Sequence, residues 1–549
     1  MLLPLVSART TRFYATTPTE KPPEPCESLS CESSAAAGTR SGGVDDGSSS
    51  SRRKGRASGD GSGSVFPITS SPMLDAALTT IVGLGMVFLG GVAYLAWYKK
   101  NVLDKIELAF APGYDPALEL ANNSVKIQNL ETSDDSKEFG SDIDIPWTEH
   151  LRRQEQDLVD AIITGEETGH YYVLVGPKGG GKSTMVFDAM RGIQAEGVAF
   201  LEAHPDLEVF RLRLGKALNY EFNEDSQTGL FQRRDPREAL TKLEKVALRL
   251  ARRRGRPLIL VINNIQHFHN DEEGRNMLLQ LQQRAEAWAA GGILTVVFNT
   301  DDSWPFLAMR KSASRMHVIS IHDLNSTQAE QALTQIRRTA RKPLTSLNDP
   351  KEVVSLLGGR LALLNRASRA DDMVQSAREM LRFEKAWLQS QIGLIPDCDD
   401  DVMDEQKWSS CSWLLLREFV KLRQEQELAR KEAGDDSNLD PIDLPSIPYV
   451  GIRWRCRQIM TRPDFLEDLD RVNIISIDIN LDVRPDSMLI LHAAREVVEE
   501  DGFEDLLDNV QNRVDAIESL HRTRELTFKD LVPGDKLRLS VDKGGSLAK

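Results

Sequence analysis

Apolar positions along the 549-residue chain form three patterns, and each predicts a different kind of structure. The first is an unbroken apolar run over residues 76–97, which at about 1.5 Å per residue is long enough to cross a hydrocarbon layer of about 30 Å. Aromatic residues and lysines typical of a membrane interface end this run: Tyr94, Trp97, Tyr98, Lys99 and Lys100. We therefore expect one transmembrane helix with its flanks at residues 73–100.

The second pattern covers residues 145–325, where short continuous apolar runs alternate with stretches of helical periodicity. We expect strands at residues 171–175, 258–262, 293–299 and 317–321, and helices near residues 237–253 and 274–290. Continuous apolar strands that alternate with helices indicate an α/β fold with a parallel sheet covered on both faces. Residues 326–396 are expected to form a small helical lid behind this sheet.

The third pattern follows an acidic break at residues 397–405. Helices come first, and two strand-like runs at residues 473–480 and 487–494 come after them. Helices followed by a hairpin resemble a winged helix, so we expect a winged-helix-like α+β domain at residues 397–535. A short tail, residues 536–549, completes the chain.

A glycine-rich loop between the first expected strand and the following helix carries the candidate chemistry. Gly176, Gly181, Lys182 and Ser183 meet the GxxxxGK[ST] spacing of a phosphate-binding loop. Glycines let the backbone N–H groups point at phosphates, Lys182 would reach the β and γ phosphates, and Ser183 would hold Mg²⁺. The predicted ligands are therefore ATP and Mg²⁺. The predicted binding residues are Gly176, Pro177, Lys178, Gly179, Gly180, Gly181, Lys182, Ser183 and Thr184.

The order of loop, strands and helices resembles the AAA+ ATPases and their STAND-type relatives over residues 145–372, a P-loop NTPase fold. The loop is similar to their Walker A motif, and residues 153–155 resemble a short Arg-x-Glu motif that often precedes it. The resemblance implies a sensor-1 role for Asn299, arginine-finger roles for Arg310 and Arg315, and a sensor-2 role for Arg360. Because an arginine finger acts on a neighbouring subunit, the resemblance also makes a homo-oligomer a candidate assembly. With its C-terminal domain, the chain resembles fungal mitochondrial AAA proteins that end in a winged helix.

Two amides stand where the resembled family presents acids. In that family the position of Asn263 holds an Asp that binds Mg²⁺ through water, and the position of Asn264 holds a Glu that activates the attacking water. An amide has no charge and takes no proton near neutral pH, so Mg²⁺ binding would weaken and base catalysis would largely vanish. Four nearby residues are candidate substitutes, although solvated loop positions are the better interpretation for the histidines: His267, His269, Asp271 and Glu272.

The charge of the chain bears on whether its partner is a protein or a nucleic acid. The formal net charge of −15 argues against a dedicated nucleic-acid coat, which would need excess Lys and Arg. The helix before the expected hairpin carries four acids that phosphates would repel: Asp464, Glu467, Asp468 and Asp470. Protein contact is therefore favoured for the winged helix, and nucleic acid stays open because four arginines lie just before this helix: Arg453, Arg455, Arg457 and Arg462.

The N-terminal segment has the composition of a targeting sequence. Residues 1–14 carry Arg9 and Arg12 and no acid, as mitochondrial presequences do, and cleavage after Tyr14 is expected. Residues 15–72 are too poor in apolar side chains to form a core and are expected to be a disordered spacer, and residues 101–144 a linker. The inner membrane is the expected location. The flanking lysines favour the matrix for the C-terminal side and a cleaved presequence favours the intermembrane space, so the side stays open.

Two functions are consistent with these residues. The first is a membrane-anchored mitochondrial AAA+-like ATP-binding protein that remodels or assembles protein partners, with weak or partner-dependent hydrolysis. The alternative is a non-hydrolysing ATP-binding scaffold, which would tether a protein complex or mitochondrial nucleic acid. Five scattered cysteines without CxxC spacing make a zinc site improbable, and the absence of an HExxH motif argues against a metalloprotease in the same chain.

Overall fold

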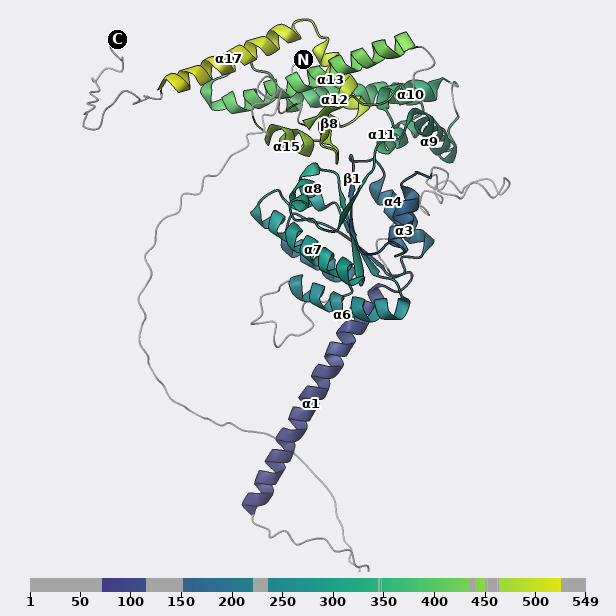
Figure 1. Cartoon of the computed structure of the whole chain (residues 1–549), viewed down its shortest axis with the longest axis vertical. Coiled ribbons are helices and arrows are strands. Elements are labelled where there is room, and N and C mark those ends of the chain that lie inside the picture. Colours follow the sequence, from purple (N-terminus) through teal and green to yellow (C-terminus); the bar gives the residue numbers. More distant parts are fainter. Residues whose placement is uncertain are drawn as a thin grey trace, which may run out of the picture. The chain divides into compact units, whose positions relative to one another are not determined.

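A computed structural model describes residues 72–114, 152–220, 236–343, 346, 348–433, 440–449, 452, 462 and 464–524 (Figure 1). The expected presequence, nearly all of the expected spacer, most of the linker and the tail lie outside the described residues. So do Arg453, Arg455 and Arg457. By its internal contacts the chain divides into a unit that ends at Thr80, of which residues 72–80 are described, and a unit from Ile81 to Lys549.

Helix α1 (Pro72–Ala109) contains the expected transmembrane run. Residues Ala77–Ala109 are long and apolar enough to cross a membrane, by length and composition alone. The apolar side chains between Leu78 and Trp97 are exposed, whereas Val102 and Ile106 are buried in the core of the following domain. The helix thus continues beyond residue 100, where a linker is expected, and its last turns pack against folded protein.

Five parallel strands form the central sheet in the order β2-β3-β4-β1-β5. Their bounds are β1 Tyr171–Val175, β2 Val198–Glu202, β3 Leu258–Asn263, β4 Leu294–Thr300 and β5 Met316–Ser320. Strands β1, β3 and β4 are buried along their whole length because helices cover both faces of the sheet. The predicted parallel sheet of a P-loop NTPase fold is confirmed, with β2 as the strand that the apolar pattern did not single out.

Two hydrophobic clusters lie on the two faces of this sheet, because successive side chains of a strand point to opposite sides. Tyr172 and Leu174 of β1 face α3 and α4, whereas Tyr171 and Val173 face the other cluster, to which α5 to α8 and the end of α1 contribute. In Figure 1, α3 and α4 lie on one side of the sheet and α7 and α8 on the other. The helix bounds are α3 Gln156–Ile163, α4 Lys182–Gly192, α5 Leu207–Ala217, α6 Pro236–Arg254, α7 Glu272–Gly291 and α8 Ser303–Arg310, with the short helix η2 at Ile265–His267.

The lid and the C-terminal module share one continuous hydrophobic cluster. The lid contains α9 Ser326–Thr339, α10 Asp349–Leu357, α11 Leu361–Ser368 and α12 Met373–Gln391. The C-terminal module contains η3 Asp400–Val402, α13 Met403–Ala433, β6 Ile447–Pro448, α15 Asp464–Arg471, β7 Ile475–Ile477, β8 Asp482–Pro485, α16 Met488–Val498 and α17 Phe503–Arg524. Its three short strands are antiparallel in the order β6-β8-β7.

One strand of the expected hairpin is wrong in position. The run at residues 487–494 forms the start of α16, and the strand that pairs with β7 is β8, in the segment expected to be the loop. Ser487 caps α16 by accepting a hydrogen bond from the Ile490 N–H at 3.3 Å. Four consecutive residues at the start of α16 are buried, so the run lacks the polar stripe of a surface helix and reads like a buried strand: Met488, Leu489, Ile490 and Leu491.

Candidate nucleotide-binding site

The loop between β1 and α4 is shaped by glycines that no larger residue could replace. A Cβ atom on Gly176 would lie 2.1 Å from the carbonyl oxygen of Ile321, and a Cβ atom on Gly179 would lie 2.7 Å from the Cβ atom of Ala362. Gly179 and Gly181 also have positive φ angles of 78° and 100°, which side chains rarely allow. The sequence therefore places glycine where the backbone must curl closely under its neighbours.

Three successive carbonyl groups of the loop are held from outside. Lys178 O accepts from the Arg360 guanidinium at 2.9 Å, Gly179 O from the Ala362 N–H at 3.2 Å, and Gly180 O from the Arg153 guanidinium at 2.8 Å. In a trans peptide the C=O and the next N–H point in opposite directions. The N–H groups of Gly179 and Gly181 are thereby directed away from these contacts, to the concave side of the loop, as an anion-binding turn requires. The Gly180 N–H donates to Pro177 O at 3.2 Å.

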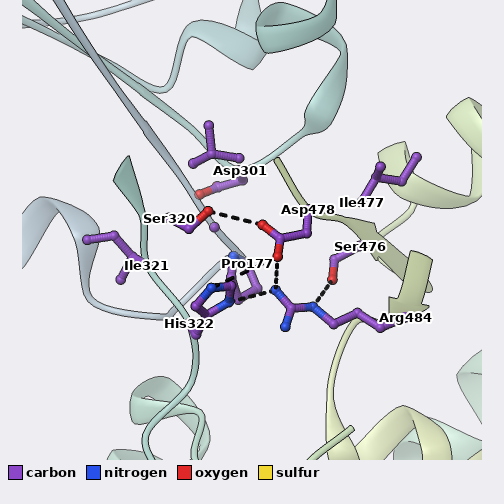
Figure 2. Close-up of a pocket in the computed structure, with 11 residues that line it drawn as sticks. Pro177, Asp301, Ser320, Ile321, His322, Ser476, Ile477, Asp478 and Arg484 are labelled. Atoms are coloured by element: carbon purple, nitrogen blue, oxygen red, sulfur yellow. Dashed lines mark hydrogen bonds and ion pairs between the residues drawn. The ribbon is translucent and has the colours of Figure 1, made fainter. Parts of the chain in front are cut away.

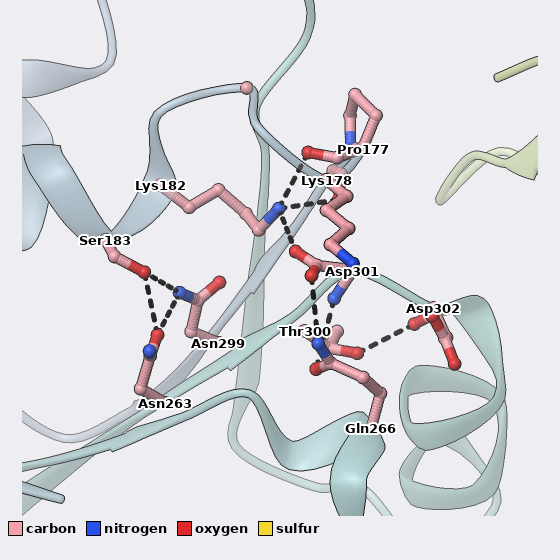
Figure 3. Close-up of polar contacts among 12 residues, drawn as sticks. Pro177, Lys178, Lys182, Ser183, Asn263, Gln266, Asn299, Thr300, Asp301 and Asp302 are labelled. Carbon is pink, nitrogen blue, oxygen red and sulfur yellow. Dashed lines mark hydrogen bonds and ion pairs between the residues drawn. The ribbon is translucent and has the colours of Figure 1, made fainter. Parts of the chain in front are cut away.

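Lys182 lies across this concave side (Figure 3). Its side chain is 4% exposed, and its Nζ donates to Gly176 O at 2.7 Å and Pro177 O at 2.9 Å. Nζ also forms an ion pair with Asp301 Oδ1 at 2.6 Å. Burial lowers the pKa of Lys182, and the Asp301 carboxylate opposes that shift. The loop lysine thus already has an anion as its partner.

Gln266 of η2 holds Asp301 by two contacts. Its Nε2 donates to Asp301 Oδ2 at 2.9 Å, and its Oε1 accepts from the Asp301 N–H at 3.3 Å. Neither residue is singled out by the sequence pattern. One feature of the sequence could have identified Asp301 as a site residue: it lies two positions after Asn299, so it is at the same edge of the sheet as the loop.

Three uncharged side chains meet at the start of α4. Ser183 Oγ donates to Asn263 Oδ1 at 2.9 Å, and Asn299 Nδ2 donates to Ser183 Oγ at 3.1 Å and to Asn263 Oδ1. The structure therefore brings the predicted Mg²⁺ ligand together with the amide of β3 and the predicted sensor-1 amide (Figure 3). Asn264 lies next to them, in a left-handed conformation with φ of 56° at the start of η2.

These donors fit a hard cation such as Mg²⁺, which takes hydroxyl and amide oxygens as ligands. Asn299 Oδ1 is buried and has no hydrogen-bond partner among the described residues, so an acceptor oxygen is available there. The side chains of Ser183, Asn263 and Asn299 carry no charge. In the described ranges, no group of three or more His, Cys, Asp or Glu side chains could hold a metal ion. Ser183 would hold Mg²⁺ with Asn263 and Asn299 beside it, and the bound ion would neutralise phosphate charge.

Arg360, at the predicted sensor-2 position, is buried and joins three parts of the chain. It contacts Asp323 before the lid at 2.8 and 3.2 Å, and Asp486 of the C-terminal module at 2.9 Å, in addition to the loop carbonyl of Lys178. Burial alone would lower the pKa of Arg360, but the two carboxylates raise it. Burial raises the pKa of Asp486, with Arg360 acting against that shift. The arginine is thus a charged link between loop, lid and C-terminal module.

The predicted finger residues lie elsewhere and are exposed. Arg310 is the last residue of α8, with its guanidinium 6.0 Å from the centre of the Phe306 ring. Arg315 donates to Gly169 O at 3.2 Å, just before β5. In the described part of the chain, neither arginine forms a hydrogen bond or an ion pair with residues 176–184. Their exposure leaves them accessible to another subunit.

A second contact joins the start of α8 to the C-terminal module. Asp470 of α15 accepts hydrogen bonds from the Ser303 N–H at 2.8 Å and the Ser303 hydroxyl at 2.7 Å. Burial raises the pKa of Asp470 to about 7, and burial next to Asp301 raises the pKa of Asp302 to about 7. Of the four acids on this helix, Asp470 is therefore the one that points into the core of the chain.

A small cavity of about 10 Å³ lies between the start of the loop and the hairpin (Figure 2), with room for about one water molecule. Ser320 Oγ donates to Asp478 Oδ1 at 3.0 Å, and Arg484 of β8 donates to His322 Nδ1 at 2.8 Å. Burial lowers the pKa of His322, and the nearby Arg484 cation lowers it further. The ring is therefore neutral at physiological pH, with Nδ1 free to accept from Arg484. Pro177 and Asp301 line the same cavity.

Two segments of the chain match known domain families. Residues 149–296 match the AAA ATPase domain, and residues 389–518 match the C-terminal winged helix domain of fungal AAA proteins. The chain combines an AAA ATPase domain with a fungal AAA winged helix domain. The predicted resemblance is thereby confirmed, and nucleotide binding is the property that an AAA ATPase domain implies. The winged helix domain is the C-terminal module described above, which contacts the ATPase domain through Asp486 and Asp470.

Solved structures similar to the chain include proteins of Pyrococcus, Pyrobaculum and Aeropyrum. A Walker-type ATPase of Pyrococcus abyssi is 14% identical, with 66% of this chain and 99% of that chain covered and a TM-score of 0.40. The Cdc6 protein of Pyrobaculum aerophilum is 14% identical, with 67% and 95% covered and a TM-score of 0.32. The ORC2 protein of Aeropyrum pernix is 13% identical, with 67% and 95% covered and a TM-score of 0.35. A comparison with curated proteins gave no match.

Proposed function

We propose that the chain is a membrane-anchored, ATP-binding protein of the mitochondrial inner membrane that uses nucleotide binding to remodel or assemble protein partners. ATP and Mg²⁺ would occupy the loop at residues 176–184. The apolar part of α1 would anchor the chain, and its docked end would hold the ATPase domain close to the membrane surface.

The observation that carries this proposal is the position of Arg360. Its guanidinium contacts Lys178 O of the nucleotide loop and Asp486 of the winged helix domain at 2.9 Å each. A phosphate chain that enters the loop would change the electrostatic potential at the Arg360 guanidinium and the geometry of the backbone next to it. The change reaches the winged helix domain directly, because one side chain touches both. Nucleotide state would therefore alter how the winged helix domain is held.

Hydrogen exchange tests this coupling. We expect Mg-ATP to change the exchange protection of amides in α15 and around Asp486, which lie outside the nucleotide loop. The Lys182→Ala variant should show no such change, because it lacks the phosphate-binding cation. If ATP binds and protection changes only within residues 171–192, the loop and the winged helix domain are not coupled.

Protein is favoured over nucleic acid as the partner of the winged helix domain. In a DNA-binding winged helix the helix before the hairpin enters the major groove. Here α15 is acidic, and Asp470 and Glu467 are turned to the ATPase domain, where they bond Ser303 and Asn270. DNA retention that falls steeply with salt concentration would reverse this preference.

The second candidate function is a scaffold that binds ATP without hydrolysing it. Its support is the neutral trio of Ser183, Asn263 and Asn299, which offers neither charge for Mg²⁺ nor a base for water. Phosphate release by the full chain separates the two functions. Release that depends on Lys182 and rises more steeply than linearly with protein concentration would favour an oligomer completed by Arg310 or Arg315. ATP binding without release would favour the scaffold.

A further inference from the structure

The acid that β3 lacks has a counterpart on the neighbouring strand. Asp301 follows β4, is 15% exposed, and lies 2.6 Å from the Nζ of Lys182. Gln266 fixes both its carboxylate and its N–H, so the side chain is aimed at the loop rather than at solvent. Lys182 is the lysine that would bind phosphate, and here its partner is a carboxylate. The Asp301 oxygens therefore occupy the position that phosphate oxygens would take.

We propose that Asp301 is the proton acceptor of this site. The inference rests on the proposed function, namely that the loop binds ATP. When the triphosphate enters, Lys182 turns from Asp301 to the β and γ phosphates, and the Asp301 carboxylate is released beside the γ phosphate. Gln266 acts as a positioning residue that keeps the carboxylate there.

The reaction balances without any further reactant. A water oxygen forms a bond to the γ phosphorus, and the bond from that phosphorus to the β–γ bridging oxygen breaks. The water proton moves to a carboxylate oxygen of Asp301. ADP and phosphate leave, and Asp301 returns its proton to the phosphate or to solvent before it pairs with Lys182 again.

Other acids near the loop have different partners. Asp323 and Asp486 hold Arg360, and Asp470 holds Ser303. Asp271, one of the substitutes considered from the sequence, caps α7 by accepting from the Gly274 N–H at 2.7 Å. The histidines of that group, His267 and His269, are exposed. Asp301 is the carboxylate that, among the described residues, bonds the loop lysine itself.

The two roles of Asp301 predict effects of opposite sign. Without nucleotide, its carboxylate competes with phosphate for Lys182, so removing the charge should tighten ATP binding. A hydrogen bond to a charged group contributes about 1.5–3 kcal/mol, which corresponds to roughly tenfold or more in affinity. With nucleotide bound, the loss of the proton acceptor should slow hydrolysis by about 10²–10⁴-fold. A merely structural residue would weaken both properties.

The test uses the full chain in detergent or nanodiscs and two readouts. Calorimetry gives the dissociation constant for Mg-ATP, and phosphate release gives turnover at saturating ATP. We expect Asp301→Asn to bind ATP about tenfold more tightly and to lose at least 99% of turnover. Asp301→Glu should keep part of the turnover, because it retains a carboxylate. Asp271→Asn is the matched control, since Asn preserves the cap of α7, and both readouts should stay at the wild-type value.

Four outcomes are separable. Asp301→Asn with wild-type turnover overturns the proposal, and so does weaker ATP binding with an unchanged melting temperature. A wild-type chain that binds ATP but releases no phosphate also overturns it and leaves the ATP-binding function intact. A wild-type chain that binds no ATP refutes the proposed function itself. If Asp301→Asn does not fold, Gln266→Ala gives the second test, and turnover should fall without weaker ATP binding.

Discussion

Replacing Arg360 by Gln should disconnect the nucleotide loop from the winged helix domain. The side chain is 5% exposed, and its partners Asp323 and Asp486 are 19% and 10% exposed, so all three charges depend on one another rather than on water. Removing one partner of a buried ion pair costs about 3–5 kcal/mol, because the remaining charge is left unpaired. Here two carboxylates lose their shared cation. We therefore expect the free energy of unfolding to fall by about 3–5 kcal/mol at pH 8.

The pH dependence of this loss identifies its cause. Burial already raises the pKa of Asp486 with Arg360 present, and without the cation the pKa rises further. A group whose pKa is raised in the folded state contributes stability below its unfolded pKa and loses that stability as pH increases through its folded pKa. The Arg360→Gln variant should therefore be less impaired at pH 5.5 than at pH 8. Protonation at low pH removes the unpaired charge.

Urea unfolding at both pH values measures the effect, and calorimetry with Mg-ATP measures its functional consequence. Adding Asp486→Asn to Arg360→Gln should recover part of the stability at pH 8, since it removes the unpaired carboxylate. Arg366→Gln is the matched control in α11, the helix that begins directly after Arg360, because its side chain is exposed and its loss should change stability by less than about 0.5 kcal/mol. Two results would show that Arg360 does not link the nucleotide loop to the winged helix domain. One is a loss of less than about 1 kcal/mol in the free energy of unfolding of Arg360→Gln, and the other is a loss that does not depend on pH.

Three further predictions follow from single contacts. Ile106→Ala should cost the ATPase domain about 2–5 kcal/mol in urea unfolding, because Ile106 is fully buried where α1 docks, whereas Leu108→Ala at an exposed position of α1 should cost little. Gly176→Ala should abolish ATP binding in calorimetry, since its Cβ would lie 2.1 Å from a carbonyl oxygen, and Gly192→Ala, with nothing within 4 Å, should not. Asp470→Asn should flatten the decline in melting temperature between about pH 4 and pH 7, because a carboxyl whose pKa is raised to about 7 in the folded chain loses stability from its unfolded pKa of about 4 up to that value. An unchanged decline would show that Asp470 stays ionised throughout this range.

The sequence predicts the sheet and the loop because both leave short-range signals. Continuous apolar runs fix β1, β3 and β4, and the spacing from Gly176 to Ser183 requires the curl that the structure shows. The start of α16 has the pattern of a strand because residues 488–491 are four consecutive buried apolar residues without a polar position among them. The docking of α1 beyond residue 100 was also invisible, because its partners in the core lie far away in the sequence.

The polar network around the loop could not be predicted either, because its partners are also far apart in the sequence. Asp486 contacts Arg360 across 126 positions of sequence, and Gln266 contacts Asp301 across 35, so no local pattern relates the partners. The family pattern predicts acids at the positions of Asn263 and Asn264, and the nearest alternatives by sequence lie in the loop after them. The structure places the loop's carboxylate on the adjacent strand instead, where parallel strands end at the same edge of the sheet.

The binding of Mg-ATP to the loop at residues 176–184 underlies every functional statement made for this chain. Calorimetry on the full chain, with wild type and Lys182→Ala at equal concentration, tests it most directly. We expect saturable binding of one nucleotide per chain by the wild type and a loss of at least about a hundredfold in affinity for the variant, because a buried charge contact to phosphate is removed. Absence of nucleotide binding by a folded wild-type chain, or equal binding by the variant, would contradict the account.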